Sequence, residues 1–146
     1  MIKHDIMKPL ITSQDWPPNI DEIRKHFELT GDEIFTYGKI IYNPNKKTLT
    51  PDLLAHESVH LEQQSGKAEE WWKLYLADSV FRAYQECPAH WTQYQIAKSI
   101  IKDRNKRFLY AKQLAMNLSS VVYGKMMTFN QAYDLITSNK PPIVLK

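Results

Sequence analysis

From residue 67 onward, apolar residues recur at intervals of three or four, the spacing of helices that bury one face. Residues 67–100 carry the longest such pattern, and Pro88 within it predicts a kink or a division of the helix. Residues 103–124 predict a further amphipathic helix that ends at a glycine. Residues 128–137 predict a last short helix with a threonine cap. These patterns indicate a mainly helical C-terminal half.

The first part of the chain combines irregular segments with short elements. Residues 1–18 contain a Trp-Pro-Pro cluster, and we expect an irregular N-terminal arm there. Residues 19–28 predict a short helix, and the aromatic and β-branched residues of 33–44 predict one or two strands. Residues 50–66 begin with Thr-Pro-Asp and end with a glycine. They therefore predict a helix with a threonine N-cap and a left-handed glycine at its end.

The order of these elements predicts a single α+β domain over residues 1–146, mainly helical, with a small β-sheet or hairpin before the helix of 50–66. The 146 residues suffice to bury a core, and the content of 43% hydrophobic and 24% charged residues is typical of folded proteins. No apolar run is long enough to span a membrane, and the sequence does not open on a signal peptide. We therefore expect a cytoplasmic protein without a membrane partner.

Basic residues are concentrated near the C-terminal end. Residues 98–146 contain nine Lys or Arg against two Asp, a net charge of +7 in a chain whose total is +3. Such a segment can bind an anionic partner, but basic side chains also commonly solvate the outer face of a helix. No nucleic-acid-reading motif accompanies this charge, so we expect no sequence-specific nucleic-acid binding.

The sequence His56-Glu57-Ser58-Val59-His60 falls inside the helix predicted over residues 50–66. Histidines four residues apart lie on one helix face, where both imidazoles can bind one metal ion at roughly 2.0–2.1 Å. Glu57 is rotated about 100° around the helix from His56, so it is placed to act on a metal-activated water rather than to bind the metal. The pattern predicts a Zn²⁺ site with His56 and His60 as ligands and Glu57 as the general base of a hydrolase.

A catalytic zinc ion needs a third protein ligand and one position left for water. Glu86 is the leading candidate. The sequence Glu86-Cys87-Pro88-Ala89 resembles the ExxA motif of minimal gluzincin-type peptidases, in which HExxH is followed by a glutamate on a second helix. This resemblance implies a zincin-like fold with a metal held by His56, His60 and Glu86, and with Glu57 as the base. It also implies that an extended peptide lies along the edge of the strand before the active helix.

A looser likeness covers residues 33–97. Its short matches are Phe35-Thr36-Tyr37-Gly38, Ile41-Tyr42-Asn43-Pro44, His56-Glu57-Ser58-Val59-His60-Leu61-Glu62-Gln63-Gln64, Trp71-Trp72 and Phe81-Arg82. In these segments the chain looks like small phage-encoded proteins with a HExxH core. The likeness implies a location in the host cytoplasm if this chain, too, is phage-encoded.

Two departures from the gluzincin pattern leave alternatives open. Pro88 lies two residues after the proposed ligand Glu86, and longer gluzincins often have an aspartate four residues after that ligand, where this chain has His90. His90 can orient a ligand, donate to an oxyanion as a catalytic residue, or be the third ligand itself.

Other residues are candidates for contact with a substrate. The phenols of Tyr37, Tyr42 and Tyr94 are predicted substrate-binding groups, because a phenol can donate a hydrogen bond to a tetrahedral intermediate. Trp71-Trp72 can wall a substrate groove, although helical spacing places at least one of the two in the core. Cys87 is the single cysteine, so it has no internal disulfide partner, and we expect a small buried filler rather than a ligand.

The sequence therefore predicts a zinc-dependent metallopeptidase that hydrolyses bonds in a peptide or protein substrate. The alternative is a non-catalytic phage structural or host-interacting protein, in which zinc stabilises a pair of helices without turnover. A further rival is a binder of nucleic acid or another anionic surface, whose affinity would fall steeply with salt.

Overall fold

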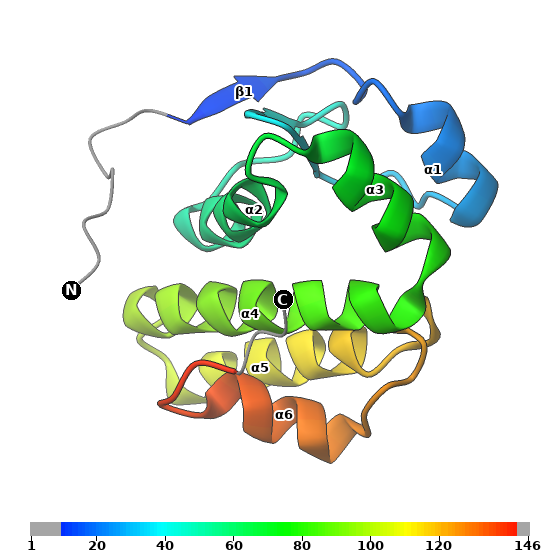
Figure 1. Ribbon diagram of the computed structural model, residues 1–146. Coiled ribbons are helices and arrows are strands. Elements are labelled where there is room, and N and C mark those ends of the chain that lie inside the picture. Colours follow the sequence, from blue (N-terminus) through cyan, green and yellow to red (C-terminus); the bar gives the residue numbers. More distant parts are fainter. Residues whose placement is uncertain (1–9, 143–146) are drawn as a thin grey trace.

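The computed structural model describes residues 10–142, and the long helix α4 runs through the middle of the molecule (Figure 1). The helices are α1 (Ile20–His26), α2 (Pro51–Gln64), α3 (Ala68–Ala77), α4 (Ser79–Ile100), α5 (Arg104–Leu118) and α6 (Phe129–Thr137). A small sheet, α1, α2 and α3 lie on one side of α4, and α5 and α6 lie on the other (Figure 1). The predicted α+β class with a mainly helical domain is confirmed.

Three short strands form the sheet, with β3 (Ile40–Tyr42) between β1 (Ile11–Ser13) and β2 (Phe35–Tyr37). β1 is parallel to β3, whereas β2 is antiparallel to β3 and joined to it by a two-residue turn. Gly38 opens that turn at φ 66°, a left-handed conformation that glycine adopts at little cost. The prediction of an irregular arm was wrong at β1, because pairing with β3 is a long-range contact that local sequence does not reveal. Residues 1–9 of that arm lie outside the described residues.

The third predicted element divides at Asp78 rather than at Pro88. Asp78 has an extended backbone, and its carboxylate accepts hydrogen bonds from the N–H groups of Val80 and Phe81. This cap starts α4, which continues through Pro88 without a break. A proline destabilises a helix interior by about 3 kcal/mol. Packing of α4 against helices on both of its sides outweighs that local effect.

Capping signals in the sequence mark the two ends of α2 and the start of α6, although the Thr50 side chain makes no capping hydrogen bond at the start of α2. Pro51 takes the first position of α2, as predicted, and the helix ends with Ser65 and Gly66 both in left-handed conformations at φ 44° and 78°. Thr128 and Gln131 form a reciprocal capping box at the start of α6.

The connection from α5 to α6 contains a short 3₁₀ helix, η1 (Val121–Tyr123), which contacts α4. The helix predicted over residues 103–124 therefore ends earlier than expected, and the glycine at its predicted end closes η1 instead. Gly124 has φ 73°, and a Cβ atom there would lie only 2.9 Å from the Cβ atom of Ser79. The absence of a side chain at Gly124 therefore lets η1 pack closely on the beginning of α4.

Two apolar clusters lie on opposite sides of α4. The N-terminal core has the buried members Ile23, Phe35, Trp71, Trp72, Tyr75 and Leu76. The C-terminal core has the buried members Cys87, Tyr94, Ala111, Leu114, Ala115, Leu118, Ala132 and Ile136. Cys87 is thus the small buried residue that the sequence predicts. Within residues 10–142, no helix has both the length and the apolar character to cross a bilayer.

Candidate metal centre

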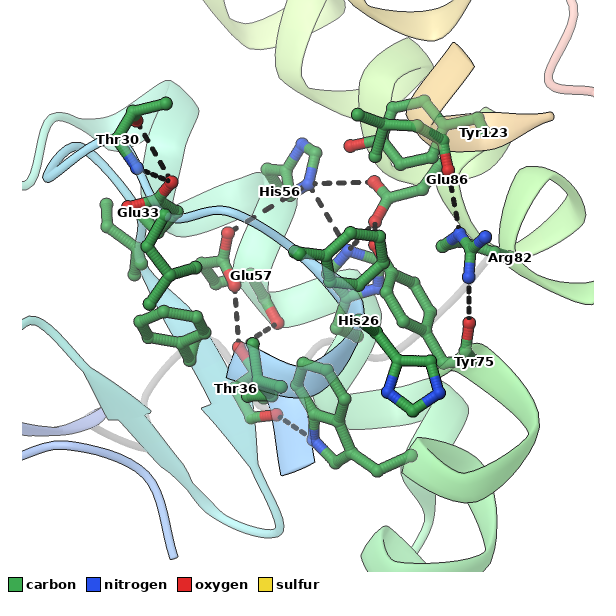
Figure 2. Close-up of a pocket in the computed structure, with 18 of the residues that line it drawn as sticks. His26, Thr30, Glu33, Thr36, His56, Glu57, Tyr75, Arg82, Glu86 and Tyr123 are labelled. Carbon is green, nitrogen blue, oxygen red and sulfur yellow. Dashed lines mark hydrogen bonds and ion pairs between the residues drawn. The ribbon is translucent and has the colours of Figure 1, made fainter. Parts of the chain in front are cut away.

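A cavity of about 680 Å³ lies among α1, α2, α3, α4 and η1, with residues 26–30 and 33–36 forming one wall (Figure 2). Trp71 and Trp72 line the cavity from α3 and are also buried in the N-terminal core. Four polar residues that the sequence singles out line it as well: His56, Glu57, His60 and Glu86. These four predicted site residues of α2 and α4 therefore share one cavity.

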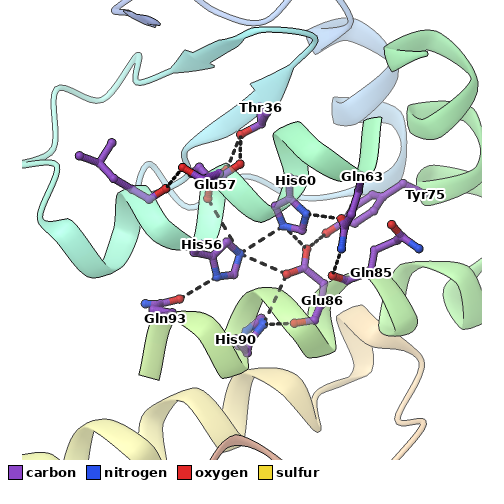
Figure 3. A network of polar contacts seen from close by, with 12 residues as sticks. Thr36, His56, Glu57, His60, Gln63, Tyr75, Gln85, Glu86, His90 and Gln93 are labelled. Carbon is purple, nitrogen blue, oxygen red and sulfur yellow. Dashed lines mark hydrogen bonds and ion pairs between the residues drawn. The ribbon is translucent and has the colours of Figure 1, made fainter. Parts of the chain in front are cut away.

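His56, His60 and Glu86 bring three potential metal ligands together where α2 packs on α4 (Figure 3). The two Nε2 atoms are 3.2 Å apart, and the Glu86 carboxylate oxygens lie 3.2 Å from His56 Nε2 and 3.3 Å from His60 Nε2. Tetrahedral ligands at about 2.1 Å from a zinc ion are separated by about 3.4 Å, so these spacings suit such an ion. Glu86 Oε1 is buried, and no hydrogen bond from residues 10–142 reaches it, as expected of an atom that faces a cation.

Glutamine side chains fix both imidazoles with Nε2 directed at this group of ligands. The Nδ1 atom of His60 lies 2.8 Å from Gln63 Oε1, and the Gln63 amide nitrogen donates to the backbone oxygen of Gln85 at 2.8 Å. The Nδ1 atom of His56 lies 2.7 Å from Gln93 Oε1. Because an amide oxygen only accepts hydrogen bonds, each Nδ1 carries a proton and each Nε2 keeps its lone pair for a metal ion.

A chain of hydrogen bonds extends from His56 to α5 and back to the start of α2. The Gln93 amide nitrogen donates to the Tyr110 hydroxyl at 2.6 Å, and that hydroxyl donates to Asp52 Oδ2 at 2.5 Å. Burial alone would raise the pKa of Asp52, but hydrogen bonds from Thr50 and Tyr110 outweigh burial and lower it. The ionised Asp52 carboxylate therefore orients Tyr110, and through it the Gln93 amide that holds His56.

Two of the three potential metal ligands, His60 and Glu86, form a buried ion pair. Burial alone would raise the pKa of the Glu86 carboxyl, but the charge of His60 and the close imidazole nitrogens around the carboxylate hold it well below 4.5. Burial alone would lower the pKa of His60, but the Glu86 carboxylate outweighs burial and raises it from 6.5 to about 9. A proton and a divalent cation therefore compete for the same Nε2 atom of His60.

Tyr75 holds the second oxygen of the Glu86 carboxylate. Its hydroxyl donates to Glu86 Oε2 at 2.5 Å, and its ring stacks on Trp71 with ring centroids 4.8 Å apart. Burial and the nearby Glu86 charge raise the pKa of Tyr75 and of Tyr123, which lines the cavity from η1. Both phenols thus remain neutral hydrogen-bond donors beside the ligand group.

Glu57 lies beside the three ligands rather than among them. Its Oε1 atom accepts a hydrogen bond from the Thr36 hydroxyl at 2.8 Å, and its Oε2 atom lies 3.9 Å from His56 Nε2. Thr36 belongs to β2, so the sheet positions this carboxylate at the edge of the cavity (Figure 2). The rotation of Glu57 away from the ligand positions agrees with its place in the helix.

His90 is buried one helical turn after Glu86 but is not one of the three clustered ligands. Its Nδ1 atom donates to the Glu86 backbone oxygen at 2.9 Å and lies 3.4 Å from Glu86 Oε1. The imidazole ring meets the rings of His56 and Tyr123 edge to face, with centroids 5.0 and 5.8 Å away. Of the two candidates for the third ligand, Glu86 lies within reach of a metal ion shared with His56 and His60, whereas the Nδ1 atom of His90 lies against Glu86. A catalytic role for His90 stays a prediction.

Tyr37, Tyr42 and Tyr94 do not line the cavity. The first two pack against the N-terminal core, and Tyr94 is buried in the C-terminal core on the other side of α4. The tyrosines that do line the cavity are Tyr75 and Tyr123. A substrate-binding role for the first three stays a prediction. A tyrosine is equally suited to core and cavity, so only packing decides its place.

The edge of β2 is closed where the gluzincin resemblance places an extended peptide. The Thr36 backbone oxygen accepts hydrogen bonds from Gln64 Nε2 at 2.7 Å and from Trp72 Nε1 at 2.9 Å. The Gly38 N–H donates to Gln64 Oε1 at 2.7 Å. The Gln64 amide thus occupies this edge as a neighbouring strand would, and a peptide cannot pair there without displacing it.

Gln63, Gln93 and Tyr110 are site residues that the sequence interpretation missed. Gln63 follows the potential ligand His60 by three residues, and Gln93 follows the potential ligand Glu86 by seven. Residues at these spacings share a helix face, so the sequence alone was enough to predict both glutamines near the site. Tyr110 reaches the site only through the packing of α5, and no local signal marks it.

The comparisons add no relative to this picture. Searches of protein-family models, of curated proteins and of solved structures find no match to the chain. The functional argument therefore rests on the chemistry of the residues.

Proposed function

We propose that the protein is a zinc-dependent metallopeptidase with His56, His60 and Glu86 as metal ligands and Glu57 as general base. The observation that carries the proposal is the set of three converging ligands beside an uncoordinated carboxylate. Two imidazoles and one carboxylate suit zinc, and three protein ligands leave a further position for a reactant. The resemblance of both motifs to gluzincins also supports it.

A zinc ion bound there would supply a Lewis acid for a carbonyl oxygen and for an attacking water. Residues of the chain around that position would have two separate roles, proton transfer and stabilisation of the oxyanion. Glu57, held by Thr36, accepts the proton of the water at Oε2 and delivers it to the leaving amide nitrogen. Tyr123 is a neutral phenol on the same cavity and donates to the developing oxyanion.

The test is a matched pair of glutamate variants on one helix. Glu57→Gln should keep one zinc ion per chain and lose hydrolysis of a mixed peptide library by at least about 100-fold, because the amide keeps the shape but not the basic oxygen. Glu62→Gln removes an exposed carboxylate of α2 and should change neither property. Elemental analysis and mass spectrometry of the library are the measurements. Full activity in Glu57→Gln would remove Glu57 from the mechanism.

A second candidate function is a protein stabilised by zinc without turnover. It is favoured by the position of the ligands, which join α2 to α4 across their contact, so that a bound ion would cross-link two helices. Zinc-dependent thermal stability with no cleavage of any library peptide would favour this candidate over the peptidase.

A further inference from the structure

Arg82 is a buried cation of the cavity that the proposed mechanism does not use. It lies on α4 four residues before Glu86, hence on the same helix face and about 6 Å along the axis. Only 8% of the residue is exposed, yet it lines the same cavity as the ligand group (Figure 2). A buried guanidinium is strongly destabilising unless anions or hydrogen-bond acceptors compensate it.

The protein compensates Arg82 only in part. Its Nε atom donates to the Val122 backbone oxygen at 2.9 Å, and Nη1 donates to the backbone oxygens of Tyr75 and Leu76 at 2.6 and 3.3 Å. All three acceptors are neutral carbonyls, although the two at the end of α3 carry partial negative charge. Within residues 10–142, no carboxylate pairs with Arg82, and Nη2 has no hydrogen-bond acceptor.

Aromatic rings fix the orientation of the guanidinium. Its central carbon lies 5.0 Å from the centre of the Phe27 ring and 5.7 Å from that of Tyr75. Both rings line the cavity. With two aromatic rings beside it and two of its nitrogens bonded to backbone, the group has its Nη2 atom left to bind an anion from the cavity.

We propose that Arg82 binds a carboxylate of the substrate, one or two residues from the bond that is cleaved. The proposal rests on the peptidase function proposed above. An extended peptide advances about 3.3–3.6 Å per residue, so the helical turn between Arg82 and Glu86 corresponds to one or two residues. The carboxylate belongs either to an Asp or Glu side chain or to the C-terminus of the peptide, since both present the same planar pair of oxygens to an arginine.

The experiment uses zinc-loaded protein and small metal-binding probes. Monohydroxamates of dicarboxylic acids, in a series of increasing chain length, are compared with the matching carboxamides by calorimetry, with acetohydroxamate as the plain probe. At the best length, the carboxylate form should bind about tenfold or more tightly than its carboxamide, the effect of one charge-assisted hydrogen bond.

Variants attribute that preference to Arg82. Arg82→Gln should bind acetohydroxamate as the unaltered protein does and lose the carboxylate preference. Arg24→Gln removes an exposed arginine that lies over Trp16, outside the cavity, and should keep the preference. Should Arg82→Gln fail to fold, Arg82→Lys keeps the positive charge but lacks the paired N–H donors of the guanidinium, and it should show a reduced preference for the carboxylate. A preference that Arg82→Lys or Arg82→Gln retains in full overturns the proposal.

The remaining outcomes separate this inference from the proposed function. Binding of acetohydroxamate with no carboxylate preference at any length overturns the role of Arg82 and leaves the metal centre standing. Failure to bind zinc overturns the metal centre itself. Peptides with an acidic residue near the cleaved bond, made with free or amidated C-termini, then distinguish the two sources: a requirement for the free terminus indicates a carboxypeptidase, and cleavage of both forms indicates a side-chain carboxylate.

Discussion

Both faces of α4 are buried, but one is polar and the other is apolar. The face toward α2 and the cavity presents Arg82, Glu86, His90 and Gln93, and the face toward α5 and α6 presents Ala83, Cys87 and Tyr94. The two sets are offset by one residue, which is about 100° around the helix. On the apolar face, burial alone stabilises the packing, whereas each polar group needs a partner from another element. Within residues 10–142, Glu86 Oε1 and Arg82 Nη2 have no hydrogen-bond partner, and both residues line the cavity.

This comparison predicts that stability and metal binding can be altered separately. Leu118→Ala removes a fully buried side chain from the C-terminal core and should lower the free energy of unfolding by about 2–5 kcal/mol. Zinc affinity of the folded protein should stay unchanged, because Leu118 is neither one of the three potential ligands nor a hydrogen-bond partner of their side chains. Chemical denaturation and zinc titration are the measurements. A parallel loss of zinc affinity would show that the two faces are coupled.

On the polar face, the largest effect should come from the third ligand. Glu86→Ala should weaken zinc binding by roughly 10-fold to 100-fold or more, since loss of a ligand must at least match the loss of a group that supports one. His90→Ala should leave zinc in place and lower turnover only, because His90 is not one of the three clustered ligands and its Nδ1 atom donates to the Glu86 backbone oxygen. Competition with a chelator measures both affinities. The reverse result would make His90 the ligand.

The pH dependence of stability should differ with and without zinc. In the metal-free protein the raised pKa of His60 stabilises the fold fully below 6.5, and this contribution is lost as the pH rises toward about 9. The lowered pKa of Glu86 contributes stability above 4.5 that is lost on acidification. Zinc displaces the His60 proton, so the stabilisation by zinc should grow between pH 6.5 and 9. Thermal unfolding with and without zinc tests this, and a zinc effect that is flat over that range would argue against His60 as a ligand.

The same contrast explains what the sequence could reveal. Three features depend on spacing and capping within a few residues: the helix that contains HExxH, the cap at Thr128 and the potential ligand Glu86. The structure has each of them at the predicted residues. The division at Asp78 instead of Pro88 and the pairing of β1 depend on which elements pack together. Local sequence carries little of that information.

The positions of the tyrosines also depend on which elements pack together. The chain contains eight tyrosines, and Tyr37 and Tyr94 have the same local signal as Tyr75 and Tyr123. Their distribution between core and cavity follows from how α3 and η1 meet α4. The Gln64 side chain that closes β2 is likewise a tertiary contact, so a family-based expectation of an open edge had no means to anticipate it.

The smallest predicted effect tests how far the polar face extends. Tyr110 on α5 is linked to His56 by two successive hydrogen bonds, from Gln93 to Tyr110 and between Gln93 and His56, and His56 is a proposed metal ligand. Tyr110→Phe leaves the Gln93 amide without its acceptor and removes one of the donors to Asp52, so the Gln93 amide becomes free to turn and His56 loses part of its orientation. Direct partners of a ligand affect metal affinity by about 10–100-fold, so a group one step further should lower it by about tenfold or less. Tyr94→Phe is the matched control, because Tyr94 is buried on the apolar face. Zinc competition titrations at constant pH should show a loss for Tyr110→Phe and none for Tyr94→Phe; equal losses would mean that the hydrogen-bond chain does not support the metal centre.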